Sequence, residues 1–335
     1  MYESFYGLRD KPFRLRPDPS FFFGSKGHKR AMSYLEYGLS QGEGFIIITG
    51  EVGAGKTTLV RKLLGKINPM QIVSAHIVNT HLDPDNTLRM VAAAFGLPAE
   101  NASKAALLTQ LEQFFLHCEQ KGIRALLVVD EAQNLSPTTL EELRMLSNFQ
   151  SGERSLLQTF LLGQPEFRIT LHSEAMLQLR QRVIATYHLG PMDEEETITY
   201  IQHRLRTVGW ENDPAFDAAA YSVIHAYSGG IPRKINSLCD RLLLMGYLEE
   251  LRAFGGEHVQ DVIRDIQEEF EQPLSDASAQ TDAELRSLER QFADDALEEL
   301  QQRVGKLENA TASILKILRD ITSHTSRYPV QESKS

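Results

Sequence analysis

The segment "GEVGAGKT", residues 50–57, has the composition and spacing of a phosphate-binding loop. It matches the pattern G-x-x-x-x-G-K-[ST], in which backbone N–H groups and a helix N-terminus surround a phosphate. Gly53 and Gly55 let the backbone approach the phosphate, Lys56 is placed to contact the β- and γ-phosphates, and Thr57 offers its hydroxyl to Mg²⁺. We therefore predict a nucleotide site formed by Gly50, Glu51, Val52, Gly53, Ala54, Gly55, Lys56, Thr57 and Thr58.

An acidic pair ends a second apolar run, "ALLVVDEAQNL", residues 125–135. A parallel strand here would carry the Asp130 carboxylate to the carboxyl edge of a sheet, where it can hold Mg²⁺. Glu131 stands one residue beyond this aspartate and is the natural general base for an attacking water. Taken alone, the pair could be an acidic turn. Together with the loop, it predicts hydrolysis of a nucleoside triphosphate.

Polar side chains end two more strand-length runs at the same predicted edge. "LLGQPEF" places Gln164 there, and its amide could reach the γ-phosphate or the attacking water. "IVSAHIVNT" ends in Asn79 and Thr80, which could hold Glu131 in an inactive rotamer or simply cap the strand.

Three arginines are candidates for phosphate contacts. Arg180 and Arg182 in "LQLRQRV" could stabilise transition-state charge in a neighbouring subunit's site, or could belong to a solvated helix face. Arg233 follows the turn in "SGGIPRKIN". It is either a solvated residue at a helix start or a side chain that reaches back to the γ-phosphate.

Short apolar runs alternate with helical patterns through the first part of the chain. The runs at 44–49, 72–79, 125–130 and 156–163 have strand length, and amphipathic patterns separate them, which predicts a parallel sheet covered by helices on both faces. A further helix is expected at about 26–40. After residue 190 four capped helical patterns follow, so we expect an α/β nucleotide-binding domain over 1–190 and a small helical domain over 191–272.

The C-terminal region has a different composition. Residues 273–284 are polar and predict a linker, and 323–335 predict a disordered tail. Between them, over 285–322, apolar positions recur at alternating spacings of four and three, which predicts a coiled coil or an amphipathic helix folded onto the globular part. These positions are Ala293, Leu297, Leu300, Val304, Leu307, Thr311, Ile314, Leu318 and Ile321.

Composition narrows the function classes. The formal net charge of -10 over 335 residues gives no general attraction to nucleic acid or to anionic lipid. Cys118 and Cys239 lie far apart inside apolar helical patterns, which predicts buried free thiols in a reducing compartment. No signal peptide or run of 18 apolar residues is visible, so we expect a cytoplasmic protein that reaches the inner membrane only through a partner.

The order of these motifs resembles the AAA+ ATPases, with a P-loop NTPase parallel sheet sandwiched by helices and followed by a small all-α lid. Residues 1–270 are similar to the ExeA/GspA group of secretion ATPases, most of all to its branch encoded with exosortase and PEP-CTERM exopolysaccharide systems. The segments that carry this similarity are "FYGLRDKPFRLRPDPSFFF", "GEGFIIITGEVGAGKTTL", "VVDEAQNLSPTTLEELRMLSNFQ", "LLGQPEFR", "LRQRV" and "YSGGIPRKINSLCDRLL".

The resemblance implies roles for particular residues and partners. ATP and Mg²⁺ would be the ligands, Gln164 would be sensor 1, Arg233 would be sensor 2, and the trans-acting finger would be Arg182 in preference to Arg180. The segment with Phe13 and His28 would border the adenine. A homo-oligomer with ATP between subunits is implied.

This chain departs from the ExeA type, which continues into a transmembrane helix and a periplasmic peptidoglycan-binding domain. The coiled-coil pattern stands where that anchor would be, which suggests self-assembly or docking to a membrane-bound export or polysaccharide-assembly component. An ATP-dependent, DNA-binding regulator of the transposition type is the alternative, although no helix-turn-helix or zinc pattern supports it. A nucleotide switch with very slow turnover is a third hypothesis, which the presence of Glu131 disfavours.

Overall fold

The computed structural model describes residues 1–16, 18–78 and 84–271. It divides the chain into two compact units, Met1–Ile266 and Gln267–Ser335. The helical region after residue 190 therefore shares a unit with the α/β region, and a boundary at 190 stays a prediction. The predicted linker, coiled coil and tail lie outside the described residues, as do Asn79 and Thr80.

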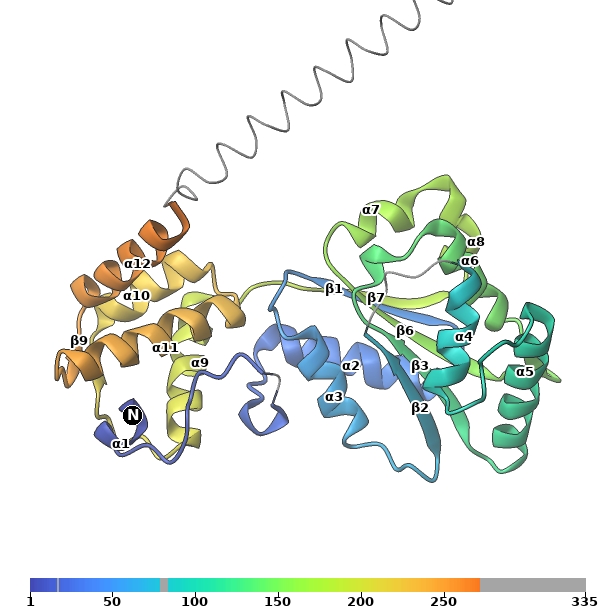
Figure 1. Ribbon diagram of the computed structural model, residues 1–335, viewed down its shortest axis with the longest axis horizontal. Helices are drawn as coiled ribbons and strands as arrows, with labels where there is room; N and C mark the ends of the chain where they lie inside the picture. Colours follow the sequence, from blue (N-terminus) through green and yellow to red (C-terminus); the bar gives the residue numbers. More distant parts are fainter. Residues whose placement is uncertain (17, 79–83, 272–335) are drawn as a thin grey trace, which may run out of the picture. The chain divides into compact units, whose positions relative to one another are not determined.

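Five parallel strands form the central sheet, in the order β2-β3-β6-β1-β7 (Figure 1). The strands are β1 Phe45–Gly50, β2 Ile72–Ile77, β3 Arg124–Val129, β6 Leu157–Gly163 and β7 Val183–Leu189. Strands β1 and β3 lie inside the sheet, and helices cover both of its faces, so side chains on both faces of these two strands are buried. This burial explains their continuous apolar runs. The predicted parallel α/β sheet is confirmed.

Helices cover both faces of this sheet. Helices α2 Lys26–Gln41 and α3 Lys56–Leu64 pack on the face that carries Ile46 and Ile48. The opposite face, with Phe45 and Ile47, is covered by α4 Pro84–Ala94, α5 Lys104–Gln120, α6 Pro137–Leu146, α7 Phe167–His172 and α8 Leu177–Arg180. Short 3-10 turns lie at η1 Pro19–Phe21, η2 Ala132–Asn134 and η3 Glu174–Met176.

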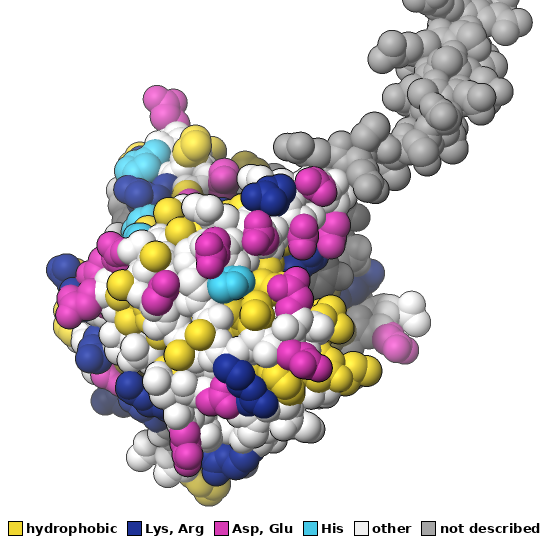
Figure 2. All heavy atoms as spheres, turned by 90° about the vertical axis from the view of Figure 1, so that its left-hand side faces the viewer, with side chains coloured by type: hydrophobic (Ala, Val, Ile, Leu, Met, Phe, Trp, Pro, Cys, Tyr) yellow, Lys and Arg dark blue, Asp and Glu magenta, His cyan; other side chains and the backbone are white. Residues whose placement is uncertain are grey.

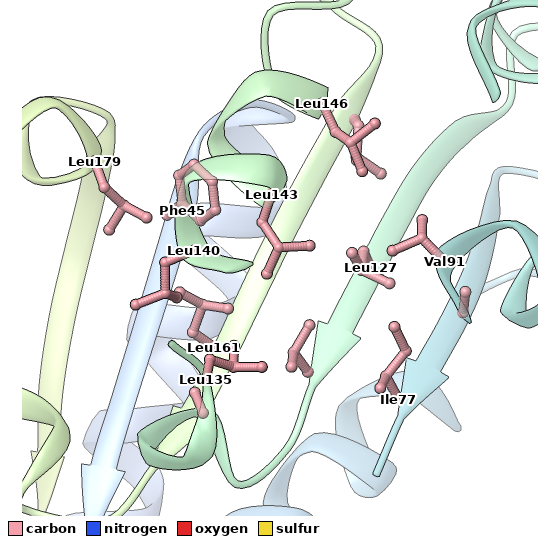
Figure 3. Packing of buried hydrophobic residues seen from close by; sticks show 14 of the residues in the cluster. Phe45, Ile77, Val91, Leu127, Leu135, Leu140, Leu143, Leu146, Leu161 and Leu179 are labelled. Atoms are coloured by element: carbon pink, nitrogen blue, oxygen red, sulfur yellow. The ribbon is translucent and has the colours of Figure 1, made fainter. Parts of the chain in front are cut away.

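Helix α6 shows how a sequence pattern is converted into packing. Ser136 caps it by accepting a hydrogen bond from the Thr139 N–H at 3.1 Å. Leu140, Leu143 and Leu146 then recur at three-residue spacing and are fully buried, and Figure 3 shows them directed toward the strands beneath. This packing fixes the segment that follows Asp130 and Glu131 against the sheet.

A helical region follows the sheet. It contains α9 Glu194–Thr207, α10 Ala218–Ser228, α11 Pro232–Leu248 and α12 Gly256–Glu271. Asp193 and Glu196 form a capping box at the start of α9. The N-terminal segment, with helix α1 Tyr2–Phe5, joins the core of this region through Tyr2, Tyr6 and Phe13.

The sequence patterns missed several strands. Strand β7 pairs only with β1, so it is a sheet edge, and its exposed Thr186 and His188 interrupt the apolar run that would have identified it. The hairpin of β4 Gln150–Ser151 and β5 Arg154–Ser155 is too short to leave a pattern. The parallel pair of β8 Ala215–Phe216 and β9 Ala253–Phe254 also means that the helical region is not purely α-helical.

Both cysteines are buried free thiols, as the sequence predicts. Among the helices that the structure describes, none has the length and apolar character needed to cross a bilayer.

Candidate nucleotide-binding site

The predicted phosphate loop connects the end of β1 to the start of α3, at the carboxyl edge of the sheet. Gly53 and Gly55 have φ angles of 82° and 98°, which side chains other than glycine rarely adopt. A Cβ at Gly53 would lie 2.2 Å from Arg233 Cβ, and one at Gly55 would lie 2.8 Å from His28 Nε2. Both glycines are therefore required by backbone conformation and by the close approach of other segments.

Lys56 is almost completely buried in the loop. Its Nζ donates hydrogen bonds to the carbonyl oxygens of Gly50 at 2.7 Å and Glu51 at 3.0 Å. Burial lowers the pKa of this ammonium group, and the nearby charges of Glu131 and Asp130 oppose that effect. A phosphate would replace the loop carbonyls as the partner of Lys56 and bring further negative charge to the buried cation.

Thr57 and Asp130 lie together, as a magnesium site requires. The Thr57 hydroxyl donates to Asp130 Oδ2 at 2.6 Å, and Asp130 Oδ1 accepts from the Glu131 N–H at 3.0 Å. Asp130 is only 3% exposed, so its carboxylate has a fixed position. A hydroxyl and a carboxylate beside a phosphate loop are hard oxygen ligands, and these two residues fit Mg²⁺. No cluster of three or more His, Cys, Asp or Glu side chains suited to a metal occurs in the described part of the chain.

Glu131 is held by two amide side chains. Its Oε2 accepts hydrogen bonds from Gln133 Nε2 at 2.6 Å and Gln164 Nε2 at 3.1 Å. Burial raises the pKa of this carboxyl group, but the two amide donors and the charge of Lys56 outweigh burial, so the net pKa is below its usual value. Glu131 is therefore an ionised carboxylate at neutral pH, which a general base must be.

Gln133 is a functional candidate that the sequence analysis missed. Besides donating to Glu131, it accepts a hydrogen bond at its Oε1 from the Gln164 backbone N–H at 2.9 Å. It therefore ties the end of β3 to the end of β6. The signal in the sequence was an amide two residues after the candidate base, but only the left-handed backbone of Glu131, with φ 53°, directs the two side chains toward each other.

Arg233 lies at the start of α11, directly against the phosphate loop. Gly229 ends α10 in the left-handed conformation and Pro232 occupies the first turn of α11, as the local sequence predicts. The Arg233 backbone N–H donates to the Gly53 carbonyl at 3.2 Å. Its exposed side chain lines the same pocket as Lys56 and Glu131.

The N-terminal segment forms another wall of this pocket. Arg14, Phe21, Phe22 and His28 line it, and so do Tyr200 and Arg204 of α9. Phe13 instead is buried in the core of the helical region, at 1% exposure, and does not line the pocket.

His28 attaches this N-terminal wall to the loop. Its Nε2 lies 3.1 Å from the Ala54 carbonyl, which can only accept, so Nε2 carries the proton and Nδ1 accepts from the Ser25 hydroxyl at 2.7 Å. Burial lowers the pKa of His28, in keeping with this neutral form.

Arg180 is the last residue of α8, Arg182 lies between α8 and β7, and both are half-buried. Arg180 Nη1 donates to the carbonyls of Leu171 and Ser173, at 2.7 and 3.0 Å. Arg182 Nη1 donates to the carbonyl and hydroxyl of Ser147, at 3.1 and 3.0 Å. Neither lines the pocket that holds Lys56.

These features together define a P-loop AAA fold: a five-stranded parallel sheet, a phosphate loop after β1, an acidic strand end on β3 and helices after the sheet. The model of the family described as AAA domain matches residues 39–171.

Solved structures with low sequence identity share this fold. The Aeropyrum pernix ORC2 protein in its ADP form aligns with a TM-score of 0.56 and 16% identity over 78% of this chain and 72% of that chain. Cdc6p from Pyrobaculum aerophilum aligns with a TM-score of 0.55 and 15% identity, over 78% of this chain and 70% of that chain.

A curated relative is similar at the level of sequence. General secretion pathway protein A of Aeromonas hydrophila is 40% identical over 248 residues, which are 74% of this chain and 45% of that protein. The chain therefore spans less than half the length of this relative. The similarity supports the predicted resemblance to the ExeA/GspA group, but it does not address the exosortase branch.

Proposed function

We propose that this chain is an ATP-hydrolysing AAA+ switch that serves an envelope export system, of the exopolysaccharide (exosortase) type, and acts as an oligomer with ATP at subunit interfaces. The observation that carries the hydrolytic part is the position of the Glu131 carboxylate. Two amides hold it in ionised form next to the Thr57–Asp130 pair, at the mouth of the phosphate loop. The assignment to export rests on the similarity to General secretion pathway protein A.

Each polar group then has a task in hydrolysis. Lys56 would exchange its two carbonyl partners for the β- and γ-phosphates, and Thr57 with Asp130 would hold Mg²⁺, which would supply positive charge beside the phosphates. Glu131 accepts the proton of the attacking water. Gln164, which already donates to Glu131, orients that water or donates to the γ-phosphate.

The start of α11 couples nucleotide to the helical region. Because the Arg233 backbone bonds Gly53, a side-chain contact between Arg233 and the γ-phosphate would tighten an existing attachment. Loss of that phosphate would release it. An arginine of a neighbouring subunit, Arg182 in preference to Arg180, would complete the site after giving up its present hydrogen bonds.

Mutation of Glu131 tests hydrolysis. Glu131→Gln should lower the steady-state ATPase rate by about 100-fold or more, because the amide cannot accept the water's proton. Binding of a fluorescent ATP analogue should be retained. Turnover unchanged by Glu131→Gln would show that this site does not hydrolyse ATP by the proposed route.

The same variant tests the link to export. Full-length Glu131→Gln protein held in ATP should capture an export or polysaccharide-assembly component from a membrane extract, and Lys56→Ala protein, which cannot hold the phosphates, should not. We expect the region predicted as a coiled coil to carry this contact. Equal capture by both variants would show that capture does not depend on bound nucleotide.

DNA binding is the competing function. Figure 2 shows acidic and basic side chains interspersed over one face of the described part, without a continuous basic patch on that face. The likeness to the ORC2 protein and to Cdc6p concerns the fold. ATP-dependent duplex binding that weakens steeply with salt would favour the DNA-binding regulator over the export switch.

A further inference from the structure

His76 on β2 lies beside the predicted magnesium site, and nothing in the function proposed above uses it. In the parallel register His76 pairs with Val128 of β3, and the Asp130 N–H donates to the Ile77 carbonyl at 2.8 Å. Positions 72, 74 and 76 of β2 and 126, 128 and 130 at β3 therefore share one sheet face. Ile72, Leu126 and Val128 pack there with helix α3.

The ring of His76 is aimed at Asp130. Its Nε2 is 4.0 Å from Asp130 Oδ2, the oxygen that accepts the Thr57 hydroxyl. This nitrogen is buried and has no hydrogen-bond partner among the residues that the structure describes. A buried polar atom without a partner is uncommon in native proteins, because it loses its contact with water and gains nothing in return.

We infer that His76 is a positioning residue of the magnesium site, where its Nε2 and Asp130 Oδ2 together accept the two hydrogen bonds of one Mg²⁺-bound water. This inference rests on the Mg²⁺-nucleotide site proposed above.

The chemistry of the ion suits this pair. Mg²⁺ usually keeps several of its waters, and a water bound through its lone pair can only donate, so it needs two acceptors. Two acceptors that are 4.0 Å apart, each about 2.8 Å from the water, subtend an angle of about 90° at it, close to the angle between its two O–H bonds. Direct ligation by the imidazole is disfavoured, because Mg²⁺ prefers oxygen ligands.

The test compares nucleotide affinity with and without the metal. All measurements use the full-length chain with Glu131→Gln, so that a fluorescent ATP analogue is not hydrolysed, in excess Mg²⁺ and in EDTA. His76→Phe keeps a planar ring but removes the acceptor. It should lower the ratio of the affinity in Mg²⁺ to the affinity in EDTA by about 10-fold, the effect expected for a residue that orients a metal's ligands. Its affinity in EDTA should be unchanged.

Two further variants complete the design. His76→Asn keeps a side-chain acceptor and should restore part of the ratio, while Ser74→Ala, on the same face of β2 but farther from the edge, should not change it. Thermal unfolding without nucleotide checks that each variant folds. If His76→Phe does not fold, the affinity ratio of His76→Asn is compared with that of the protein that retains His76.

Two outcomes would overturn the inference. One is a ratio in His76→Phe equal to that of the protein that retains His76. The other is an equal loss of affinity in Mg²⁺ and in EDTA, which would mean that His76 only shapes the phosphate loop. Failure of the underlying nucleotide site would be seen separately, as absent nucleotide binding in the protein that retains His76.

Discussion

At the scale of single residues, the surroundings of each charged side chain set the direction in which its pKa shifts. Glu131 and Lys56 are both partly withdrawn from water, yet their pKa values fall for different reasons. Burial lowers the pKa of the Lys56 ammonium, whereas amide donors lower the pKa of the Glu131 carboxyl in spite of burial. Thus the amides of Gln133 and Gln164, together with the charge of Lys56, favour the ionised form of the candidate base.

The pH dependence of hydrolysis tests this role of the amides. Since the pKa of Glu131 lies below its usual value of 4.5, activity should be lost only as pH falls below that value. Gln164→Ala removes a donor to the charged form, so the pKa should rise and the acid limb should move to higher pH. The rate at neutral pH should also fall, by about tenfold or more. The measurement is the pH profile of the ATPase rate, with Gln158→Ala, on the same strand but bonded to Gly38 and Glu43, as a control for amide loss. An acid limb that does not move would contradict this account.

At the scale of elements, the turn between α10 and α11 contains two adjacent glycines that are required for different structural reasons. Gly229 has φ 56°, and a Cβ there would meet nothing within 4 Å. Gly230 has φ 70°, and a Cβ there would lie 2.0 Å from the Met192 carbonyl oxygen. Gly230 is thus required both by conformation and by the close approach of the segment that leads into α9.

Alanine at each position separates the two requirements. Gly229→Ala should cost about 1 kcal/mol in the free energy of unfolding, the cost of a left-handed alanine. Gly230→Ala should cost about 3 kcal/mol or more, because the Met192 backbone must also move. Urea unfolding of the nucleotide-free protein measures both. Equal losses would mean that the contact with Met192 relaxes without cost.

At the scale of the whole molecule, Arg233 is the proposed connection between bound ATP and assembly. Its backbone holds α11 to the loop, while its exposed side chain lines the pocket. Arg233→Ala keeps the backbone contact and removes only the guanidinium. It should weaken ATP-dependent oligomer formation by about tenfold while leaving thermal stability without nucleotide unchanged.

Sedimentation with and without ATP, at several protein concentrations, measures this effect. Lys234→Ala, the exposed neighbour on the same helix turn, is the matched control. An equal loss of thermal stability in nucleotide-free Arg233→Ala would return the arginine to a purely structural role. Assembly that does not respond to ATP in the unmodified chain would instead contradict the proposed oligomer.

The sequence by itself identified the phosphate-binding loop, the candidate site residues and four of the five strands of the sheet. The loop at 50–57, the acid pair at Asp130 and Glu131 and the strand-end Gln164 are local patterns, and buried parallel strands leave continuous apolar runs. The edge strand β7 left no such run, because the exposed Thr186 and His188 interrupt it.

Tertiary structure decided which groups meet. Gln133 bonds Glu131 and Gln164 because the backbone of Glu131 is left-handed. His76 lies beside Asp130 because β2 and β3 are neighbours in the sheet, although 54 residues separate the two in the chain. Sequence patterns report the burial and conformation of nearby residues, whereas contacts between distant residues depend on strand order and backbone direction, which only the folded chain fixes.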